Sequence, residues 1–186
     1  MKIGLIFTGY DSQFVGMAKD FYDEYRIVQD YFEEAYNCLN INFVKLCFAS
    51  SDQELSKVSN AYLSIFLVNS SLFALLKEHG IKPDLIAGYG MPGFYSAIYS
   101  ANGFTFPDGL YLLKKFTSFY EEAFPNMADI GIVKIEEITE SKFKKLCNTL
   151  NLHIASYNGK DEFIVTGLNS DILKLKEEKN NLNFKI

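Results

Sequence analysis

The stretch Asp84-Leu85-Ile86-Ala87-Gly88-Tyr89-Gly90-Met91-Pro92-Gly93-Phe94-Tyr95-Ser96 decides the fold of this chain. Residues 85–88 are apolar and predict a short core strand. The closely spaced glycines that follow predict a tight turn. Pro92 suits the first turn of a helix, where its missing amide hydrogen costs least. The stretch therefore predicts a strand, a glycine-dense turn and a helix over about 92–101.

Two interpretations of this turn compete. The spacing Gly88-x-Gly90-x-x-Gly93 matches a dinucleotide-binding fingerprint, in which glycines let the backbone approach a pyrophosphate. The same residues match the strand-to-helix elbow of an acyl-transfer site, with glycine where the nucleophile stands. The first interpretation is disfavoured because the motif lies mid-chain and Pro92 deletes one amide from the phosphate cradle. Asp108, the only acid at a suitable distance, is expected to cap a helix. We therefore expect no cofactor.

Composition excludes several classes of protein. With 186 residues, 48% of them hydrophobic, the chain can bury a substantial core. A net charge of −5 argues against nucleic-acid binding. No apolar run reaches membrane-spanning length, and residues 2–7 predict a core strand instead of a signal peptide, so we expect a cytoplasmic protein with no membrane partner. Cys38, Cys47 and Cys147 are expected to be buried free thiols, and no metal site is indicated.

The first 125 residues predict an α/β domain. Helices are expected over 16–25, 27–39 and 60–79, with a short helix opening at the capping box Ser51 to Glu54. A further helix is expected to be capped by Asp108. Its inward-facing candidates are Leu112, Leu113, Phe116, Phe119, Tyr120 and Ala123.

The pattern changes at Pro125-Asn126, which we interpret as a domain boundary. Residues 127–186 predict strand 129–135, helix 139–150, a hairpin of 152–157 with 162–166, a helix from Asn169 and a closing strand over 182–186. That order, βαββαβ, is the ferredoxin-like plan.

Several separated segments, in the same order, resemble malonyl-CoA:acyl-carrier-protein transacylases. They are Phe7-Thr8-Gly9-Tyr10-Asp11-Ser12-Gln13 with Val15-Gly16-Met17, then 45–48, 78–88, 95–97, Asp108, 121–125, Asn158 and 164–167. The resemblance covers essentially the whole chain. It implies a mainly parallel-sheet acyltransferase-like α/β core, here incomplete, over 1–125, with the ferredoxin-like segment, 127–186, as the subdomain that such enzymes insert.

The functional positions depart from the family's pattern. Its elbow is Gly-His-Ser-Leu-Gly-Glu, and the matching nucleophile position is Gly90, which has no side chain to carry an acyl group. The oxyanion amides fall at Tyr10 and Met91, and the arginine that pairs with the malonyl carboxylate falls at Phe116. The family histidine lies after the inserted subdomain, so we expect it to be missing here. Gly90 is expected to relieve the backbone strain of the elbow.

Other candidates have plain structural interpretations. Tyr10 and Tyr89 are expected to fill the former pocket, and Ser12 is expected to stabilise a loop. His79 is expected at a helix C-terminus and His153 in a strand. We call Tyr10, Tyr89, Gly90, Met91, Phe116 and Asn158 the former-pocket positions.

The resemblance implies a homologue that belongs to fatty-acid or polyketide-type metabolism. The departures from the family's pattern predict that it is catalytically inactive and acts as a binding or scaffolding protein. Its partner would be acyl carrier protein or a synthase subunit. An apolar surface left by the missing C-terminal segment is expected to form a homodimer or a heteromer. Two alternatives stay open. One is an active malonyltransferase that uses other residues or a partner chain, and the other is an acyl-CoA or small-ligand binding module.

Overall fold

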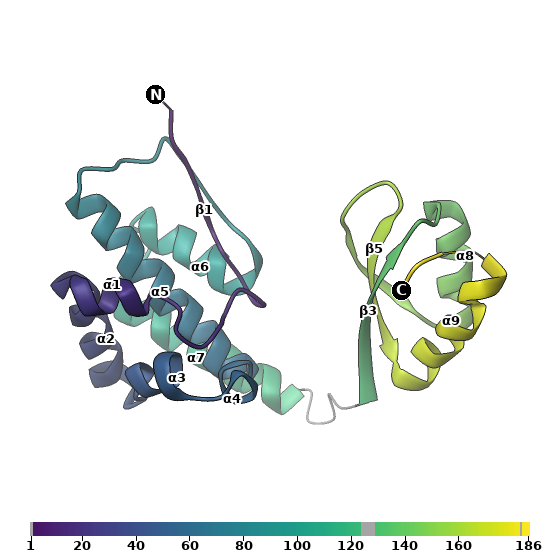
Figure 1. Ribbon diagram of the computed structural model, residues 1–186, viewed down its shortest axis with the longest axis horizontal. Coiled ribbons are helices and arrows are strands. Elements are labelled where there is room, and N and C mark those ends of the chain that lie inside the picture. Colours follow the sequence, from purple (N-terminus) through teal and green to yellow (C-terminus); the bar gives the residue numbers. More distant parts are fainter. Residues whose placement is uncertain (1, 124–128, 183) are drawn as a thin grey trace. The chain divides into compact units, whose positions relative to one another are not determined.

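Two units make up the chain in the computed structural model, residues 1–123 and 124–186, and the residues described are 2–123, 129–182 and 184–186 (Figure 1). The expected boundary at Pro125-Asn126 lies outside the described residues. The first unit contains β1 (Gly4–Phe7), α1 (Lys19–Glu24), α2 (Arg26–Leu39), α3 (Phe43–Ala49), α4 (Asp52–Leu55), α5 (Val58–Glu78), β2 (Leu85–Gly88), α6 (Gly90–Ser100) and α7 (Phe106–Ala123). The second contains β3 (Ile130–Glu136), α8 (Glu140–Leu150), β4 (His153–Tyr157), β5 (Glu162–Leu168) and α9 (Asn169–Leu182).

Helix α5 forms the centre of the first unit, and α2, α6 and α7 pack around it (Figure 1). Its buried residues lie on all sides of the helix, since Leu63, Ile65, Phe66 and Leu67 are all inaccessible to solvent or nearly so. Gly80, with φ of +75°, follows the helix in the left-handed conformation that ends helices. The predicted helix over 60–79 is confirmed, with a start two residues earlier.

Helix α5 also corrects one expectation from the sequence. By length and composition it could cross a membrane, with 21 residues and a mean hydropathy of 1.4 in its most apolar window. Counting uninterrupted apolar runs missed it because Ser, Asn and Tyr separate its aliphatic residues. Of that window, 56% is buried inside the unit, as in the core helix of a soluble protein.

The first unit has a two-stranded parallel sheet, in which β1 pairs with β2 from Gly4↔Leu85 to Phe7↔Gly88. The predicted strand, turn and helix are therefore confirmed. Helix α1 begins at Lys19, later than expected. Helix α3 was not predicted, although the Asn42 side chain caps it by accepting from the Lys45 amide at 2.8 Å. Ser51 caps α4 as expected, because Ser51 Oγ accepts from the Glu54 amide at 3.1 Å. The Glu54 carboxylate, expected to complete a capping box, instead accepts from Asn60 Nδ2 and pairs with Lys57.

Helix α7 differs from the prediction in its cap and in its buried face. Thr105 and Asp108 form a reciprocal capping box, in which the Thr105 amide donates to Asp108 Oδ2 and the Asp108 amide donates to Thr105 Oγ1. The cap is thus Thr105. The buried residues are Phe106, Gly109, Leu110, Leu113 and Thr117. The prediction that Leu112, Phe119 and Ala123 face inward is wrong, because all three are exposed.

The second unit has an antiparallel sheet in the order β3-β5-β4, with α8 and α9 against one face (Figure 1). Its core includes Phe143, Phe163, Val165 and Leu175. Among the described residues of the closing strand expected over 182–186, pairing with the sheet is limited to one bridge. Helix α9 continues to Leu182, and one antiparallel bridge joins Lys185 to Glu136 on the outer edge of β3.

Candidate active site at the strand-to-helix elbow

The elbow joins β2 to α6, and its apex is Gly90. This residue has φ of +62°, a left-handed conformation that strains residues with a side chain and that glycine adopts freely. A Cβ placed on Gly90 would lie 3.8 Å from the Gly9 Cα and 3.9 Å from the Tyr10 amide nitrogen. A side chain at this position would therefore start beside the loop that follows β1. The backbone of an elbow is present, without a nucleophilic side chain.

The neighbouring glycines serve a different purpose, because they let backbone segments touch. A Cβ on Gly88 would lie 2.0 Å from the Gly93 carbonyl oxygen, and one on Gly93 would lie 2.6 Å from the Phe7 carbonyl oxygen. A Cβ on Gly9 would lie 2.1 Å from the Tyr89 carbonyl oxygen. Both β-strands thus meet the start of α6 at distances that only glycine permits. This packing accounts for Gly88 and Gly93, and the positive φ accounts for Gly90, so the Gly88-x-Gly90-x-x-Gly93 spacing is explained without a nucleotide.

Asn69 on α5 connects the segments of the elbow by hydrogen bonds. Its Nδ2 donates to the Thr8 carbonyl oxygen at 3.0 Å and to Ser96 Oγ at 3.2 Å. Ser96 Oγ in turn donates to the Pro92 carbonyl oxygen at 2.8 Å. One amide group therefore links the loop after β1, the central helix and the first turns of α6. Nothing in the sequence pattern marked Asn69, because it lies inside a helix on an otherwise apolar face.

The side chains expected to fill the former pocket do not all do so. Tyr89 is 70% exposed, so the expectation that it fills the pocket is wrong. Its position directly after β2, at the helix N-cap, turns the ring toward solvent. Tyr10 donates to the Ser56 carbonyl oxygen at 3.0 Å. Partial burial, followed by the nearby Asp11 carboxylate, raises the pKa of Tyr10 above its ordinary value.

The other former-pocket positions are distributed over both units. Met91 is partly buried against the core of the first unit. Phe116 is half-buried, with its ring stacked between Tyr62 and Tyr120 at centroid distances of 6.2 and 6.4 Å. Asn158 lies in the turn between β4 and β5 of the second unit. Its backbone N–H donates to the Glu162 carbonyl oxygen at 3.0 Å.

The histidines and cysteines lie in structural settings. His79 Nδ1 is 3.0 Å from the Leu75 carbonyl oxygen at the end of α5, and its ring meets Tyr25 edge-on. His153 is in β4. Ser12 Oγ donates to the Gly9 carbonyl oxygen at 2.6 Å and stabilises the loop after β1. Within the described part of the chain, no cluster of three or more His, Cys, Asp or Glu residues could hold a metal ion.

The burial of the thiols differs among the three cysteines. Cys47 and Cys147 are buried, and desolvation raises the pKa of each to about 11. Cys38 is partly exposed, so the expectation that it is buried is wrong.

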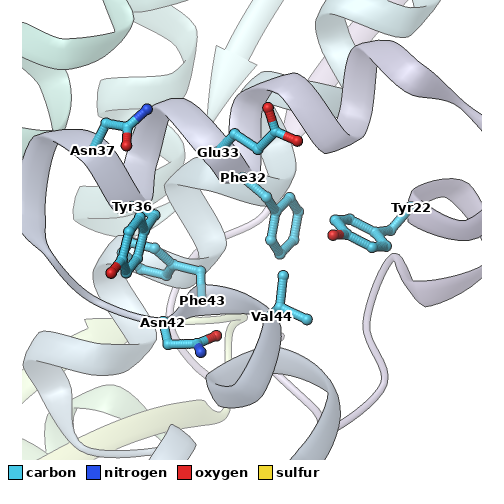
Figure 2. A pocket seen from close by; sticks show the side chains of 8 residues that line it. All are labelled: Tyr22, Phe32, Glu33, Tyr36, Asn37, Asn42, Phe43 and Val44. Carbon is cyan, nitrogen blue, oxygen red and sulfur yellow. The ribbon is translucent and has the colours of Figure 1, made fainter.

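Two cavities in the first unit lie away from the elbow. One, of about 510 Å³, lies between α1, α2 and α3 (Figure 2). Its lining consists of aromatic rings with amide and carboxylate groups: Tyr22, Phe32, Glu33, Tyr36, Asn37, Asn42, Phe43 and Val44. The other, of about 530 Å³, is lined by residues of α2, α5, α6 and the start of α7. Neither lining includes Tyr10, Gly90 or Met91.

A comparison with models of known protein families identifies the family of this chain. The model for the acyl transferase domain matches residues 5–184, and the chain belongs to this family.

Within that family, the chain is similar to malonyl CoA-acyl carrier protein transacylases. The transacylase of Bacillus subtilis (strain 168) is 34% identical over 124 residues, which cover 67% of this chain and 39% of that protein. The polyketide biosynthesis malonyl CoA-acyl carrier protein transacylase PksC of the same strain is 26% identical, covering 92% of this chain and 58% of that protein.

Solved structures give the same result. The malonyl CoA-acyl carrier protein transacylase of Clostridium perfringens matches all of this chain with a TM-score of 0.87 and 25% identity, over 59% of its own length. A type II polyketide-synthase acyl-carrier protein in complex with its malonyl-transacylase matches with a TM-score of 0.89 at 19% identity, over 61% of that chain. The chain thus spans 39% to 61% of the length of these four relatives.

Proposed function

We propose that this chain binds acyl carrier protein or a synthase subunit in fatty-acid or polyketide-type metabolism and forms no covalent acyl-enzyme. The observation that carries the proposal is Gly90 at the apex of the elbow. Acyl transfer through a covalent intermediate needs a side-chain nucleophile at the attacking position, and glycine offers none. The resemblance puts the family's serine at this residue.

Two further features support the absence of transfer. His79 is engaged by its own helix and by Tyr25, so it is not a base for the elbow. Phe116 has replaced the arginine of the family's pattern, and its stacked ring cannot pair with a malonyl carboxylate. The partner part of the proposal rests on the relatives, whose names specify acyl carrier protein, and on the neighbour solved in complex with such a protein.

The test is an assay of malonyl transfer from malonyl-CoA to a holo-acyl-carrier protein, with the Bacillus subtilis transacylase as the positive control. We expect the rate of malonyl transfer with the chain present to equal the background rate measured without any protein. Gly90→Ser alone is expected to leave it there too, because a hydroxyl without a general base is a weak nucleophile. Transfer above background by the unaltered chain would contradict the proposal and favour an active malonyltransferase.

Binding of the carrier protein is the second half of the test. Holo-acyl-carrier protein titrated into the chain should bind in the calorimeter, whereas malonyl-CoA alone should not. Binding of malonyl-CoA without the carrier protein would instead favour a small-ligand module. Fractionation of cells that produce the protein would test the cytoplasmic location that the proposal assumes.

A further inference from the structure

The second cavity of the first unit, of about 530 Å³, combines aromatic walls with charged groups. Its volume falls within the range of small-molecule sites, about 300–1,000 Å³. The aromatic residues that line it come from α2, α5, α6 and the segment that leads into α7: Tyr31, Phe73, Tyr99, Phe104 and Phe106. An apolar group of a ligand would therefore contact ring surfaces supplied by four parts of the unit.

These rings are fixed by contacts with one another. The hydroxyls of Tyr31 and Tyr99 form a hydrogen bond that joins α2 to α6. Phe106 is buried and meets both tyrosine rings edge-on, at centroid distances of 4.7 Å to Tyr31 and 6.2 Å to Tyr99. The walls of the cavity are therefore formed before any ligand enters, which lowers the entropic cost of binding.

A carboxylate lies near this pair of hydroxyls. Glu34 follows Tyr31 by three residues on α2, so both side chains share one face of the helix. Burial raises the pKa of Tyr31 and of Tyr99, and the Glu34 carboxylate raises both further. Both hydroxyls therefore stay protonated. One hydroxyl hydrogen is used in the bond between them, which leaves the other able to donate to a ligand.

The lining also includes two opposite charges that the chain does not neutralise. Glu34 comes from α2 and Lys77 comes from the last turn of α5. Within residues 2–123, 129–182 and 184–186, neither side chain forms an ion pair. Asp108, the other carboxylate of the lining, caps α7 by accepting from the Thr105 amide and hydroxyl. One carboxylate and one ammonium group thus remain available to a ligand.

The cavity between α1, α2 and α3 provides a contrast (Figure 2). Its carboxylate, Glu33, accepts from Arg26 Nη2 at 3.0 Å, and its Asn42 side chain accepts from the Lys45 amide at 2.8 Å. The described lining of that cavity includes no lysine or arginine. The chain itself has therefore neutralised the charge there, in contrast to the charges of Glu34 and Lys77.

We infer that the cavity lined by Glu34 and Lys77 is a binding site for a small zwitterion with an apolar side chain, of the class of an aromatic or large aliphatic amino acid. The ligand's ammonium contacts Glu34, its carboxylate contacts Lys77 and a tyrosine hydroxyl, and its side chain lies against the rings. Phosphate-bearing ligands are disfavoured, because two carboxylates accompany a single lysine. The inference is independent of the proposed function, since Gly90 does not line this cavity.

The test is calorimetric titration of the full chain with L-phenylalanine and with L-leucine. Two analogues of L-phenylalanine each lack one charge: 2-phenylethylamine has no carboxylate, and 3-phenylpropionate has no ammonium. We expect L-phenylalanine to bind at least about tenfold more tightly than either analogue, because each analogue leaves one charged group of the cavity without its partner.

Two substitutions assign the charges to their residues. Glu34→Gln and Lys77→Gln should each weaken binding of L-phenylalanine at least about tenfold. Glu34→Gln should also abolish the preference over 3-phenylpropionate, and Lys77→Gln the preference over 2-phenylethylamine. The matched controls are Glu24→Gln on α1 and Lys45→Gln on α3, both exposed and outside the lining. Both controls should bind L-phenylalanine like the parent.

Hydrogen exchange locates the ligand without any substitution. Bound L-phenylalanine should protect the amides of 101–106, and those of α3 should exchange as before. The inference is overturned if neither amino acid binds at millimolar concentration, if an analogue binds as tightly as L-phenylalanine, or if protection appears only elsewhere. Binding of L-phenylalanine by Glu34→Gln and Lys77→Gln that equals that of the parent would overturn it as well. If urea titrations show either variant to be less stable than the parent, the analogue series and the exchange data on the unaltered chain decide.

Discussion

At the residue scale, the glycines of the elbow are present for two different physical reasons. Gly9, Gly88 and Gly93 are required by close contact, because any Cβ would lie within 2.6 Å of a carbonyl oxygen. Gly90 is required by neither contact nor space, and only its positive φ disfavours a side chain. The position where a nucleophile would stand is therefore the one elbow glycine, among these four, that can be replaced without moving the backbone.

This difference predicts the stability of two substitutions. Gly90→Ser should lower the free energy of unfolding by about 1–2 kcal/mol, the cost of a left-handed residue with a side chain. Gly93→Ala should cost more, because its Cβ would push α6 away from the Phe7 and Thr8 carbonyl oxygens. Urea titrations measure both. Gly80→Ala, at φ of +75° with open space around it, is the control for the backbone cost alone. A smaller loss for Gly93→Ala than for Gly90→Ser would contradict this account.

The raised pKa of the Cys47 thiol predicts that the stability of the fold depends on pH. Burial raises the pKa of its thiol to about 11, whereas an unfolded cysteine titrates near 8.5. Between these values the unfolded chain releases a proton that the folded chain retains, so the free energy of unfolding falls as pH rises. Below that window this thiol contributes no slope.

Denaturant titrations of the parent and of Cys47→Ala, between about pH 8 and pH 11, isolate this contribution. The parent should lose on the order of 2 kcal/mol more than the variant over that range. Parallel curves for the two proteins would show that the thiol is not the cause.

At the scale of elements, Asn69 links the loop after β1, helix α5 and helix α6 through one side-chain amide. Replacing it with alanine leaves Ser96 Oγ and the Thr8 carbonyl without this donor, which should cost about 1–2 kcal/mol. The variant should also exchange the amides at the start of α6 faster. Asn37→Ala, at an exposed position of α2, is the matched control and should leave both measurements unchanged. Equal stability of the two variants would show that the hydrogen bonds of Asn69 do not stabilise the fold.

Sequence periodicity predicted most elements, and the failures have local physical causes. The strand over 85–88, the helices over 27–39 and 60–79, and the hairpin around Asn158 follow hydrophobic patterns that local packing preserves. Helix α3 was missed because its cap, Asn42, precedes too short an apolar run. The face of α7 was misplaced because its buried residues include Gly109 and Thr117, which a search for large apolar residues ignores.

The candidate site was predictable only in part. The sequence located the elbow and the glycine at its apex, because both depend on residue type at a fixed spacing. It did not locate Asn69, whose role depends on contacts with Thr8 and Ser96. It also could not place the Tyr89 ring in solvent. That outcome depends on the direction in which the backbone leaves β2 at the helix N-cap.

At the scale of the whole molecule, the chain is an acyl transferase family member whose first unit contains the elbow and whose described strands leave one face of their sheet bare. The proposed loss of covalent chemistry follows from the first of these features.

The central claim, that the elbow forms no acyl-enzyme, is tested most directly by the intact mass of the protein after incubation with malonyl-CoA. The Bacillus subtilis transacylase, treated in the same way, supplies the mass increase expected for one malonyl group. The account predicts an unchanged mass for this chain. A mass increase of one malonyl group, mapped by peptide analysis to any side chain near the elbow, would contradict it.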